Sequence, residues 1–313
     1  MKRKTKKHFK ETGIVGVIIA IIYIVINLFA PEIFVDTSLE SPIETSDALV
    51  EFEENFQIHF IDVDQADAIL ITQGNNAMLV DAGENATKDE VKNYLTSQGI
   101  TKLDYIVETH PHSDHIGAMY YIVDNFEVGK ALMSGKTHTT QVYEKLLKSI
   151  KAKNVEKIVP KLKDEFTLGD ATFEIVGPTY ESDYGSELNN YSRVIKFKFG
   201  NNTFLLTGDA EEKSEQDMLA SGIDLKCDLI KIGHHGSTSS TTEEFLNAVN
   251  PKYAVISVGK DNKHNLPDGR VMNMLKNYNI PVYRTDESGT IIVTSDGNKI
   301  TLNKQPGTYN YID

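Results

Sequence analysis

The sequence predicts an α/β (α+β) fold, an αββα sandwich preceded by one N-terminal transmembrane helix. Two successive runs of strand-like segments, each accompanied by helical segments, indicate two sheets packed face to face with helices on both outer faces. An apolar run near the N-terminus, followed by a polar stretch, indicates a membrane segment and a linker ahead of that domain. The chain has 313 residues, enough for one large domain or two small ones after this segment is set aside.

The N-terminal segment divides into three parts. Residues 1–13 form a basic tail, and residues 14–30 are apolar apart from Asn27, at the short end of what spans a bilayer as a helix. Because basic residues precede this run, the positive-inside rule places the tail in the cytoplasm and the domain outside the cell. A cleaved signal peptide, which would leave the domain secreted, is the alternative. Residues 31–55 are rich in Ser, Thr, Pro and acidic residues, which is typical of a flexible linker.

The domain itself, residues 56–313, shows two runs of elements. The first run is predicted to hold strands at 57–61, 68–72, 77–80, 103–107, 130–133 and 156–159, and helices at 87–98, 117–125 and 139–152. The second is predicted to hold strands at 171–176, 193–199, 203–207, 228–232, 253–258, 282–284, 290–294 and 298–302, and helices from 211, at 242–248 and at 268–278. Thr87 is expected to cap the first helix, with Glu90 at the capping-box position and Gly99 ending it.

Three imidazoles and one carboxylate crowd into six residues directly after the apolar run 103–107: His110, His112, Asp114 and His115. So many titratable groups where a buried strand ends are costly unless they bind something. Neutral imidazole and carboxylate are the ligands that zinc and related divalent metals prefer. Alternate residues of an extended chain point the same way, so the stretch offers two ligand pairs, His110/His112 and Asp114/His115. Two adjacent metal ions suit these pairs better than one; a polar loop with surface histidines is the alternative.

The pattern His-x-His-x-Asp-His after a strand resembles the metal-binding signature of the metallo-β-lactamase superfamily. Further matches follow in the expected order at 79–83 (Leu-Val-Asp-Ala-Gly), at 206–209 (Leu-Thr-Gly-Asp) and at His264. Two segments, 60–69 and 231–237, resemble the hydrolase domain of ComEC-type competence proteins. The resemblance covers about residues 56–302. It implies the αββα sandwich and two bound divalent metal ions, Zn²⁺ by default and Mn²⁺ as the other candidate.

The resemblance also implies roles for residues beyond the first cluster. Asp209 is expected to bridge the two metals, although it could instead cap the helix that follows. His264 is expected to complete the metal held by Asp114 and His115. Asp81 is expected to orient a metal-bound histidine without touching the metal, with a plain turn carboxylate as the alternative.

Five residues are expected to act on or near the substrate. His234 is the candidate general acid, Ser237 is a candidate substrate contact, and Asp67 is expected near the metals. His235 is a second candidate substrate contact, with a packed, hydrogen-bonded histidine as the alternative. Many superfamily members supply a third histidine to the first metal where this chain has Asn190, so we expect that metal to have only His110, His112 and Asp209, with Asn190 facing the substrate. A second departure is Asp64-Gln65-Ala66-Asp67, where the ComEC-type branch usually has Gly-Gln-Gly-Asp.

The distribution of charge favours one class of substrate, and the single cysteine excludes a disulfide within the chain. Six of the 32 basic residues lie in the first ten positions, so the rest of the chain carries 26 basic against 45 acidic residues, about −19. Such a body is poorly suited to holding nucleic acid over a broad surface, which favours a small-molecule or cell-envelope phosphoester as substrate. The single cysteine, Cys227, cannot form an intrachain disulfide, and we expect a monomer.

Together, the residues and the resemblance imply a membrane-anchored extracellular metal-dependent hydrolase. It is expected to cleave phosphoester bonds with metal-activated water, phosphodiesters ahead of monoesters, with Asp114, Asp209 and His234 as catalytic residues. Hydrolysis of carbon esters, thioesters or lactams at the same site is the alternative. A non-catalytic binding module on the hydrolase fold is the third reading.

Overall fold

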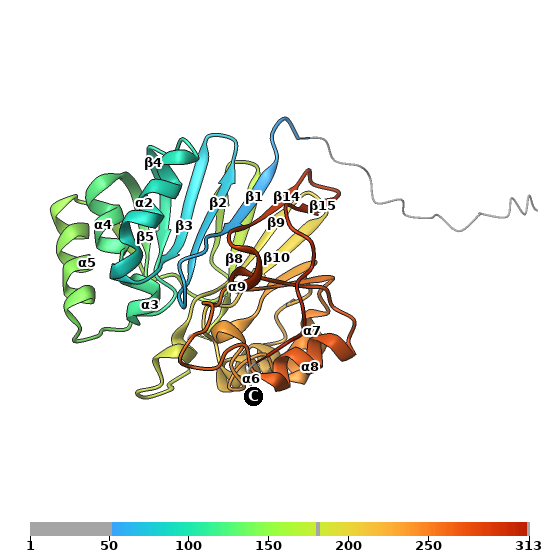
Figure 1. Cartoon of the computed structure of the whole chain (residues 1–313). Helices are drawn as coiled ribbons and strands as arrows, with labels where there is room; N and C mark the ends of the chain where they lie inside the picture. Colours follow the sequence, from blue (N-terminus) through green and yellow to red (C-terminus); the bar gives the residue numbers. More distant parts are fainter. Residues whose placement is uncertain (1–51, 180–181, 312–313) are drawn as a thin grey trace, which may run out of the picture. The chain divides into compact units, whose positions relative to one another are not determined.

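The computed structural model describes residues 52–179 and 182–311, which contain two facing β-sheets (Figure 1). The first sheet has eight strands in the order β15 (Ile300–Leu302), β14 (Ile291–Ser295), β1 (Phe56–Phe60), β2 (Ala68–Gln73), β3 (Asn76–Ala82), β4 (Lys102–Val107), β5 (Glu127–Leu132) and β6 (Glu156–Ile158). The second has seven in the order β13 (Val282–Arg284), β12 (Tyr253–Ile256), β11 (Leu229–Lys231), β10 (Asn202–Leu206), β9 (Val194–Phe199), β8 (Ala171–Gly177) and β7 (Glu165–Leu168). The predicted sandwich is confirmed.

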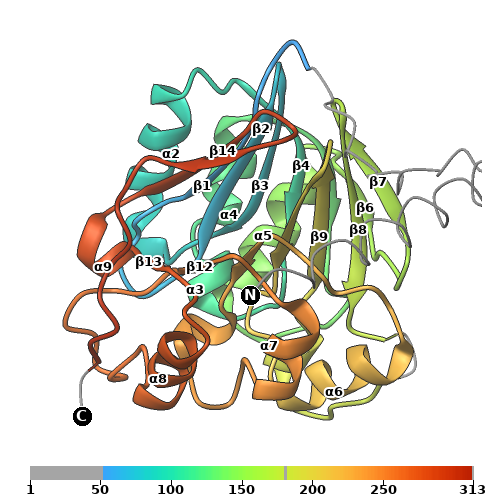
Figure 2. The ribbon, with the colours of Figure 1, turned by 90° about the vertical axis from the view of Figure 1, so that its right-hand side faces the viewer.

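Helices cover the outer faces of the two sheets (Figure 2). Those of the first half are η1 (Asn85–Thr87), α2 (Lys88–Ser97), α3 (Ser113–Ile116), α4 (Met119–Asn125) and α5 (Gln141–Ala152). Those of the second half are η2 (Leu188–Tyr191), α6 (Glu212–Ser221), η3 (Gly233–Gly236), α7 (Glu243–Val249), α8 (Gly269–Asn277) and α9 (Thr285–Ser288).

The two sheets and the helices on their outer faces form four layers, and three hydrophobic clusters fill the spaces between these layers. The cluster between the sheets is rich in aromatic side chains, which include Phe56, Phe60, Phe173, Phe197, Phe199 and Phe204. A second cluster joins the first sheet to α2, α4 and α5, and a third joins the second sheet to α6, α7 and α8. Because the central strands are buried on both faces, they are nearly continuous apolar runs, such as Phe204-Leu205-Leu206 in β10.

Parallel strands in each sheet bring several loops to one edge. Strands β3 to β6 are parallel to one another, and so are β10 to β13. The carboxyl ends of parallel strands meet at the same edge of a sheet, which is where α/β proteins place their polar sites. The metal-binding stretch follows β4, Asp209 follows β10, and the two histidines of η3 follow β11.

Several local features differ from the prediction, among them the short helical segments α3, η2 and η3, which were not expected. Strand β7 was not expected, because its four residues Glu-Phe-Thr-Leu are too short and too polar to stand out. The short helix α9 was also not expected. The capping box at Thr87 is wrong: this residue ends the turn η1, its hydroxyl donates to the carbonyl of Glu84 at 3.1 Å, and it caps no backbone N–H of α2.

No helix within residues 52–179 and 182–311 is long and apolar enough to cross a membrane. The predicted basic tail, the predicted transmembrane segment and all but the last residues of the predicted linker lie outside the described part of the chain.

A buried histidine in β1 predicts a measurable loss of stability in acid. His59 is 2% exposed, its Nδ1 lies 2.8 Å from the Tyr94 hydroxyl, and burial lowers the pKa of His59 from 6.5 to about 4. Because the folded pKa lies below the unfolded one, this contribution is present above about pH 6.5 and is lost as the pH falls through about 4. We expect His59 to lower the free energy of unfolding by about 2 kcal/mol between pH 7 and pH 5.

Urea unfolding of the wild type and of His59→Leu at those two pH values tests this expectation. The leucine variant keeps an apolar side chain in β1 and has nothing to protonate, so its pH dependence should be shallower by that amount. Equal pH dependence in the two proteins would contradict the prediction.

Candidate metal centre

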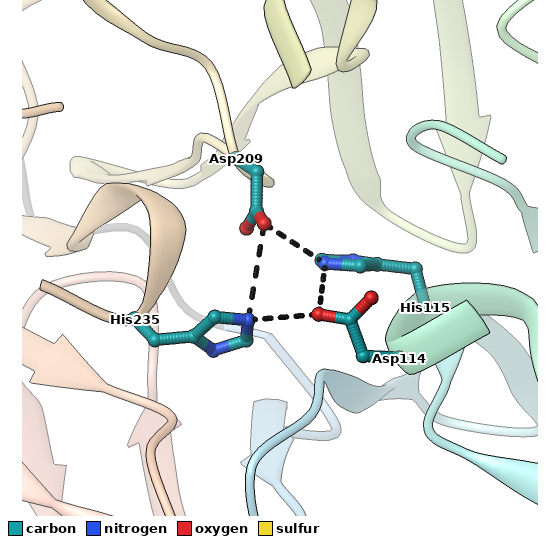
Figure 3. A group of neighbouring side chains, drawn as sticks. All are labelled: Asp114, His115, Asp209 and His235. Atoms are coloured by element: carbon teal, nitrogen blue, oxygen red, sulfur yellow. Dashed lines mark hydrogen bonds and ion pairs between the residues drawn. The ribbon is translucent and has the colours of Figure 1, made fainter. Parts of the chain in front are cut away.

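Four side chains from three separate loops converge at the edge where the parallel strands end (Figure 3). Asp114 and His115 lie on α3, Asp209 follows β10, and His235 lies on η3. One ligand atom from each of them lies within 4.8 Å of the others. His115 Nε2 is 3.1 Å from Asp209 Oδ2 and 3.5 Å from Asp114 Oδ2, and His235 Nε2 is 3.3 Å from Asp114 Oδ2.

This group fits a divalent cation. Two imidazoles and two carboxylates form a donor set that suits zinc and related metals. His115 Nε2 and Asp209 Oδ1 are buried and have no hydrogen-bond partner among the described residues, which is costly unless a cation binds them. Burial opposes charge on His115, but Asp209, Asp114 and Asp81 raise its pKa well above the usual value. Metal binding at this group must therefore displace protons.

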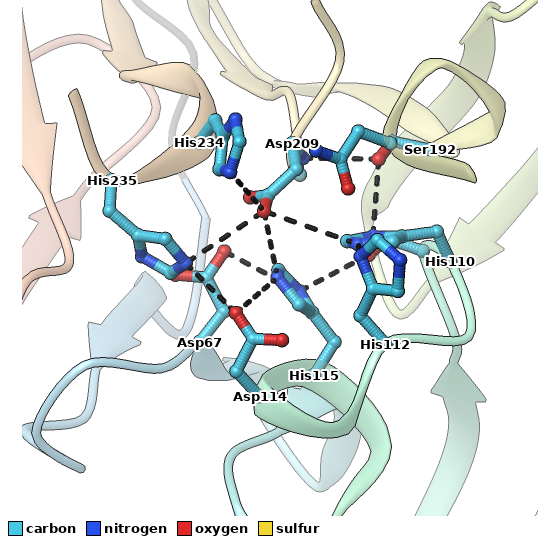
Figure 4. Close-up of polar contacts among 12 residues, drawn as sticks. Asp67, His110, His112, Asp114, His115, Ser192, Asp209, His234 and His235 are labelled. Atoms are coloured by element: carbon cyan, nitrogen blue, oxygen red, sulfur yellow. Dashed lines mark hydrogen bonds and ion pairs between the residues drawn. The ribbon is translucent and has the colours of Figure 1, made fainter. Parts of the chain in front are cut away.

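A second pair of imidazoles lies on the other side of Asp209 (Figure 4). His110 Nε2 is 2.9 Å from His112 Nδ1 and 4.0 Å from Asp209 Oδ2. Burial lowers the pKa of His110 well below its usual value, so its imidazole is neutral, as a metal ligand must be. Asp209 thus faces both His110 and the Asp114/His115/His235 group, so this carboxylate lies between two sets of potential metal ligands.

Asp81 lies behind His115. Its Oδ2 lies 2.7 Å from His115 Nδ1 and accepts the Thr109 hydroxyl at 2.7 Å, and its Oδ1 accepts the Thr109 amide at 3.0 Å. A carboxylate on Nδ1 fixes the tautomer and leaves Nε2 directed at the metal group. Asp209 does not cap α6, whose N-terminal flanking residue is Glu211.

The structure places His235 and His264 differently from the sequence prediction. His235, expected to contact substrate, is 2% exposed and joins the metal group, with its Nδ1 2.9 Å from the Ser257 carbonyl. His264, expected as a metal ligand, is exposed on the loop after β12 and does not join the group. Its backbone N–H donates to Asn262 Oδ1, and its side chain lines the outer part of the cavity.

A cavity of about 690 Å³ opens above the metal group. His112, Asp114, Asp209, His234 and His235 line its base. The loop after β12 contributes Lys260, Lys263 and His264 to the lining. Asp64, Gln65 and Glu84 also line the cavity, and Gln65 contacts this loop by accepting the Gly259 amide on its Oε1 at 3.0 Å. The cavity lining therefore carries both cationic and anionic side chains above the metal group.

His234 reaches the cavity with a carboxylate behind it. Its Nδ1 lies 3.2 Å from Glu211 Oε1 and 3.1 Å from Ser239 Oγ, and its Nε2 lies 3.8 Å from Asp209 Oδ2. Both His234 (φ 47°) and His235 (φ 54°) have left-handed backbone conformations, which are unfavourable for residues with a Cβ and are typical of functional sites. This strained turn directs the two rings toward the same space.

Two expected substrate contacts do not line the cavity. Asn190 is buried; its Nδ2 donates to Glu211 Oε2 at 3.2 Å, and its Oδ1 accepts the Ser214 amide at 3.1 Å. Ser237 directs its hydroxyl to Ser239 Oγ at 3.0 Å. Asn190 therefore positions Glu211, and through it His234, and neither residue contacts the cavity.

Asp67 is also not a cavity residue; it is buried beneath the metal group and paired with Lys231. The Lys231 ammonium lies 2.7 Å from Asp67 Oδ2 and donates to the carbonyls of Gly208 and Ile232. Burial opposes the charge, but Asp67 and Asp209 raise the pKa of Lys231. Sequence reasoning missed this lysine, although a charged residue in the apolar strand β11 was a signal.

Lys231→Met should destabilise the fold by about 3–5 kcal/mol, because it leaves Asp67 as an uncompensated buried charge. The double variant Lys231→Met/Asp67→Asn should recover a large part of that loss, since no charge then remains unpaired. Urea unfolding of the three proteins measures both effects. A double variant that is less stable than Lys231→Met would contradict this account of the pair.

The sequence of this chain is similar to a family model and to several known proteins. The family model "Metallo-beta-lactamase superfamily" matches residues 61–260. The chain is 34% identical over 198 residues to ComE operon protein 3 of Bacillus subtilis, covering 63% of this chain and 25% of that protein. It is 29% identical over 234 residues to Competence protein ComA of Neisseria gonorrhoeae, covering 74% and 31%. The chain therefore spans about a quarter to a third of the length of these relatives.

Among solved structures, the metallo-β-lactamase fold protein YhfI of Bacillus subtilis aligns with a TM-score of 0.51 at 14% identity, covering 77% of this chain and 100% of that one. At this identity the likeness shows the fold alone.

Proposed function

Because this chain belongs to the metallo-β-lactamase superfamily, we propose that it is a binuclear metal-dependent hydrolase that cleaves phosphoester bonds, phosphodiesters ahead of monoesters. One observation carries the proposal: two ligand sets, His110/His112 and Asp114/His115/His235, lie on either side of Asp209. A shared carboxylate between two ligand sets is the arrangement that holds two cations close together for hydrolysis.

The side chains of the site have different roles in the proposed hydrolysis. When bound by these residues, a pair of divalent cations would supply Lewis acidity and would lower the pKa of water. Asp209 fixes the spacing of the two sets, and Asp81 keeps His115 Nδ1 occupied so that Nε2 stays directed at the cluster. His234 is the general acid: Glu211 orients its ring through Nδ1, and Nε2 on the side of Asp209 is placed to protonate the leaving oxygen.

The charges around the cavity support a phosphoester substrate of modest size. Lys260 and Lys263 on the rim attract an anionic group, while the strongly acidic chain disfavours a long polyanion spread over the surface. A small molecule or a cell-envelope polymer segment fits these charges. Competence proteins are among the relatives, so DNA is the competing substrate.

The apolar run at 14–30 supports a membrane anchor with the domain outside the cell.

The test combines metal content with turnover, using the full chain and Asp114→Ala. The substrates are bis(p-nitrophenyl) phosphate, p-nitrophenyl phosphate, p-nitrophenyl acetate and a chromogenic β-lactam. We expect two equivalents of Zn²⁺ or Mn²⁺ in the wild type, turnover of the diester above the monoester, and loss of turnover in the variant. Bound metal with turnover only of the acetate or the lactam would move the assignment to carbon esters or lactams. No metal uptake at all would overturn the enzyme assignment in favour of a binding module.

A further inference from the structure

We propose that His138, on the loop between β5 and α5, is a protein ligand of the first metal position, the one formed by His110 and His112. The inference deepens the proposed function and rests on it, because it requires a metal ion at that position. No residue of this loop was expected in the site from the sequence.

The first metal position receives no ligand from the loop between β8 and β9. The candidate in that loop is Asn190, and both atoms of its amide are engaged, by Glu211 and by the backbone of Ser214. The nearby Ser192 hydroxyl accepts the Asp209 amide at 3.1 Å and lies 3.2 Å from His110 Nδ1, the nitrogen that faces away from His112. This loop therefore orients His110 and Asp209 and leaves the position with two imidazoles and one carboxylate.

His138 lies next to this incomplete position. Strands β4 and β5 are parallel neighbours, with Val107 paired to Leu132, so the loops that follow them run side by side. The rings of His138 and His112 have centroids 6.0 Å apart at an interplanar angle of 70°; those of His110 and His112 are 4.6 Å apart at 81°. Metal–nitrogen bonds of about 2 Å join imidazoles across separations of this order.

The loop that carries His138 is anchored at both ends. Ser134 donates its amide to Glu108 Oε2 at 2.7 Å and its hydroxyl to Glu108 Oε1 at 2.8 Å. The Tyr143 hydroxyl donates to the carbonyl of Lys136 at 2.9 Å, and Thr140 caps α5 by accepting the amide of Tyr143. The residues on both sides of His138 are thus fixed, which lets its ring be held near His112 without a bond of its own.

The ring of His138 is half-buried, and its Nδ1 is inaccessible to solvent with no hydrogen-bond partner among the described residues. A buried histidine that only fills space normally binds through at least one nitrogen, as His59 does with Tyr94. An imidazole nitrogen left unpaired beside two other metal-binding imidazoles is explained by a shared cation.

Replacement by cysteine tests direct ligation. In the full chain loaded with Co²⁺, His138→Cys should gain a thiolate-to-cobalt charge-transfer absorption in the near ultraviolet, because thiolate is a strong ligand for such metals. The wild type should lack this absorption, since its one cysteine, Cys227, is buried and lies outside the site. His264→Cys is the matched control: it places a thiol on the exposed wall of the same cavity and should give no such absorption.

Metal binding by His138→Ala provides the second readout. Titration with Zn²⁺ should show one of the two sites weakened at least tenfold, with the other unchanged, while His264→Ala retains both. Two sites of unchanged affinity in His138→Ala would overturn the inference and leave the proposed function intact. Weakened binding with no absorption in the cysteine variant would also overturn direct ligation, because His138 would then only position His112. Absence of metal from the wild type would overturn both.

Discussion

Asp209→Asn should remove metal from both positions and lower turnover by roughly a thousandfold, which corresponds to about 4 kcal/mol of lost transition-state stabilisation. Its Oδ2 lies 3.1 Å from His115 Nε2, 3.8 Å from His235 Nε2 and 4.0 Å from His110 Nε2, so both ligand sets depend on this one carboxylate. Asparagine has nearly the same volume but carries no charge. Its amide nitrogen cannot ligate a metal and would instead donate toward the imidazoles.

Metal content of the purified protein, together with diester turnover, measures both effects. Asp64→Asn is the matched control for metal content. It removes a carboxylate from the cavity wall, away from the metal group, and asparagine suits the positive φ of 58° at that position. The control should keep both equivalents. If Asp209→Asn also retained two equivalents and full turnover, Asp209 would not be the shared ligand, and the binuclear reading would fail.

Local sequence patterns were sufficient for the fold. Strands such as β10 and β11 are short apolar runs that end in glycine or polar residues, and helices such as α5 repeat apolar residues with helical spacing. The resemblance to the metallo-β-lactamase superfamily and to ComEC-type competence proteins is confirmed. Strand β7 was missed because a four-residue edge strand with two polar positions carries almost no periodic signal.

From the residues alone, the metal site could be predicted only where its ligands are close in sequence, whereas Asp81, Asp209 and His234 were expected from the resemblance. The stretch from His110 to His115 is recognisable in the sequence as a candidate metal site, because four potential ligands follow one strand within six residues. Asp67 and Lys231 form their buried ion pair across the two sheets, and no sequence pattern near either residue indicates its partner. His138 is a single histidine in a polar loop, and only the pairing of β4 with β5 brings it beside His112.

The second large effect concerns which histidine, His235 or His264, binds the metal held by Asp114 and His115. Both histidines follow neighbouring parallel strands, β11 and β12, so strand order alone places both at the same edge. Backbone conformation separates them: the left-handed turn at His235 sends its ring inward, and the Ser257 carbonyl near Nδ1 holds it there. His264 lies on a loop that extends outward to the cavity wall.

His235→Ala should therefore lose the metal held with Asp114 and His115, with turnover reduced by roughly a hundredfold or more, whereas His264→Ala should keep both metals. Zinc titration of the two variants measures this contrast directly. Combining His235→Ala with His138→Ala should leave neither position with full affinity, because the two changes act on opposite sides of Asp209. The reverse result, with metal lost from His264→Ala and retained in His235→Ala, would require the loop after β12 to fold inward when metal binds. In that case the outer wall of the cavity, and not the strained turn after β11, would complete the site.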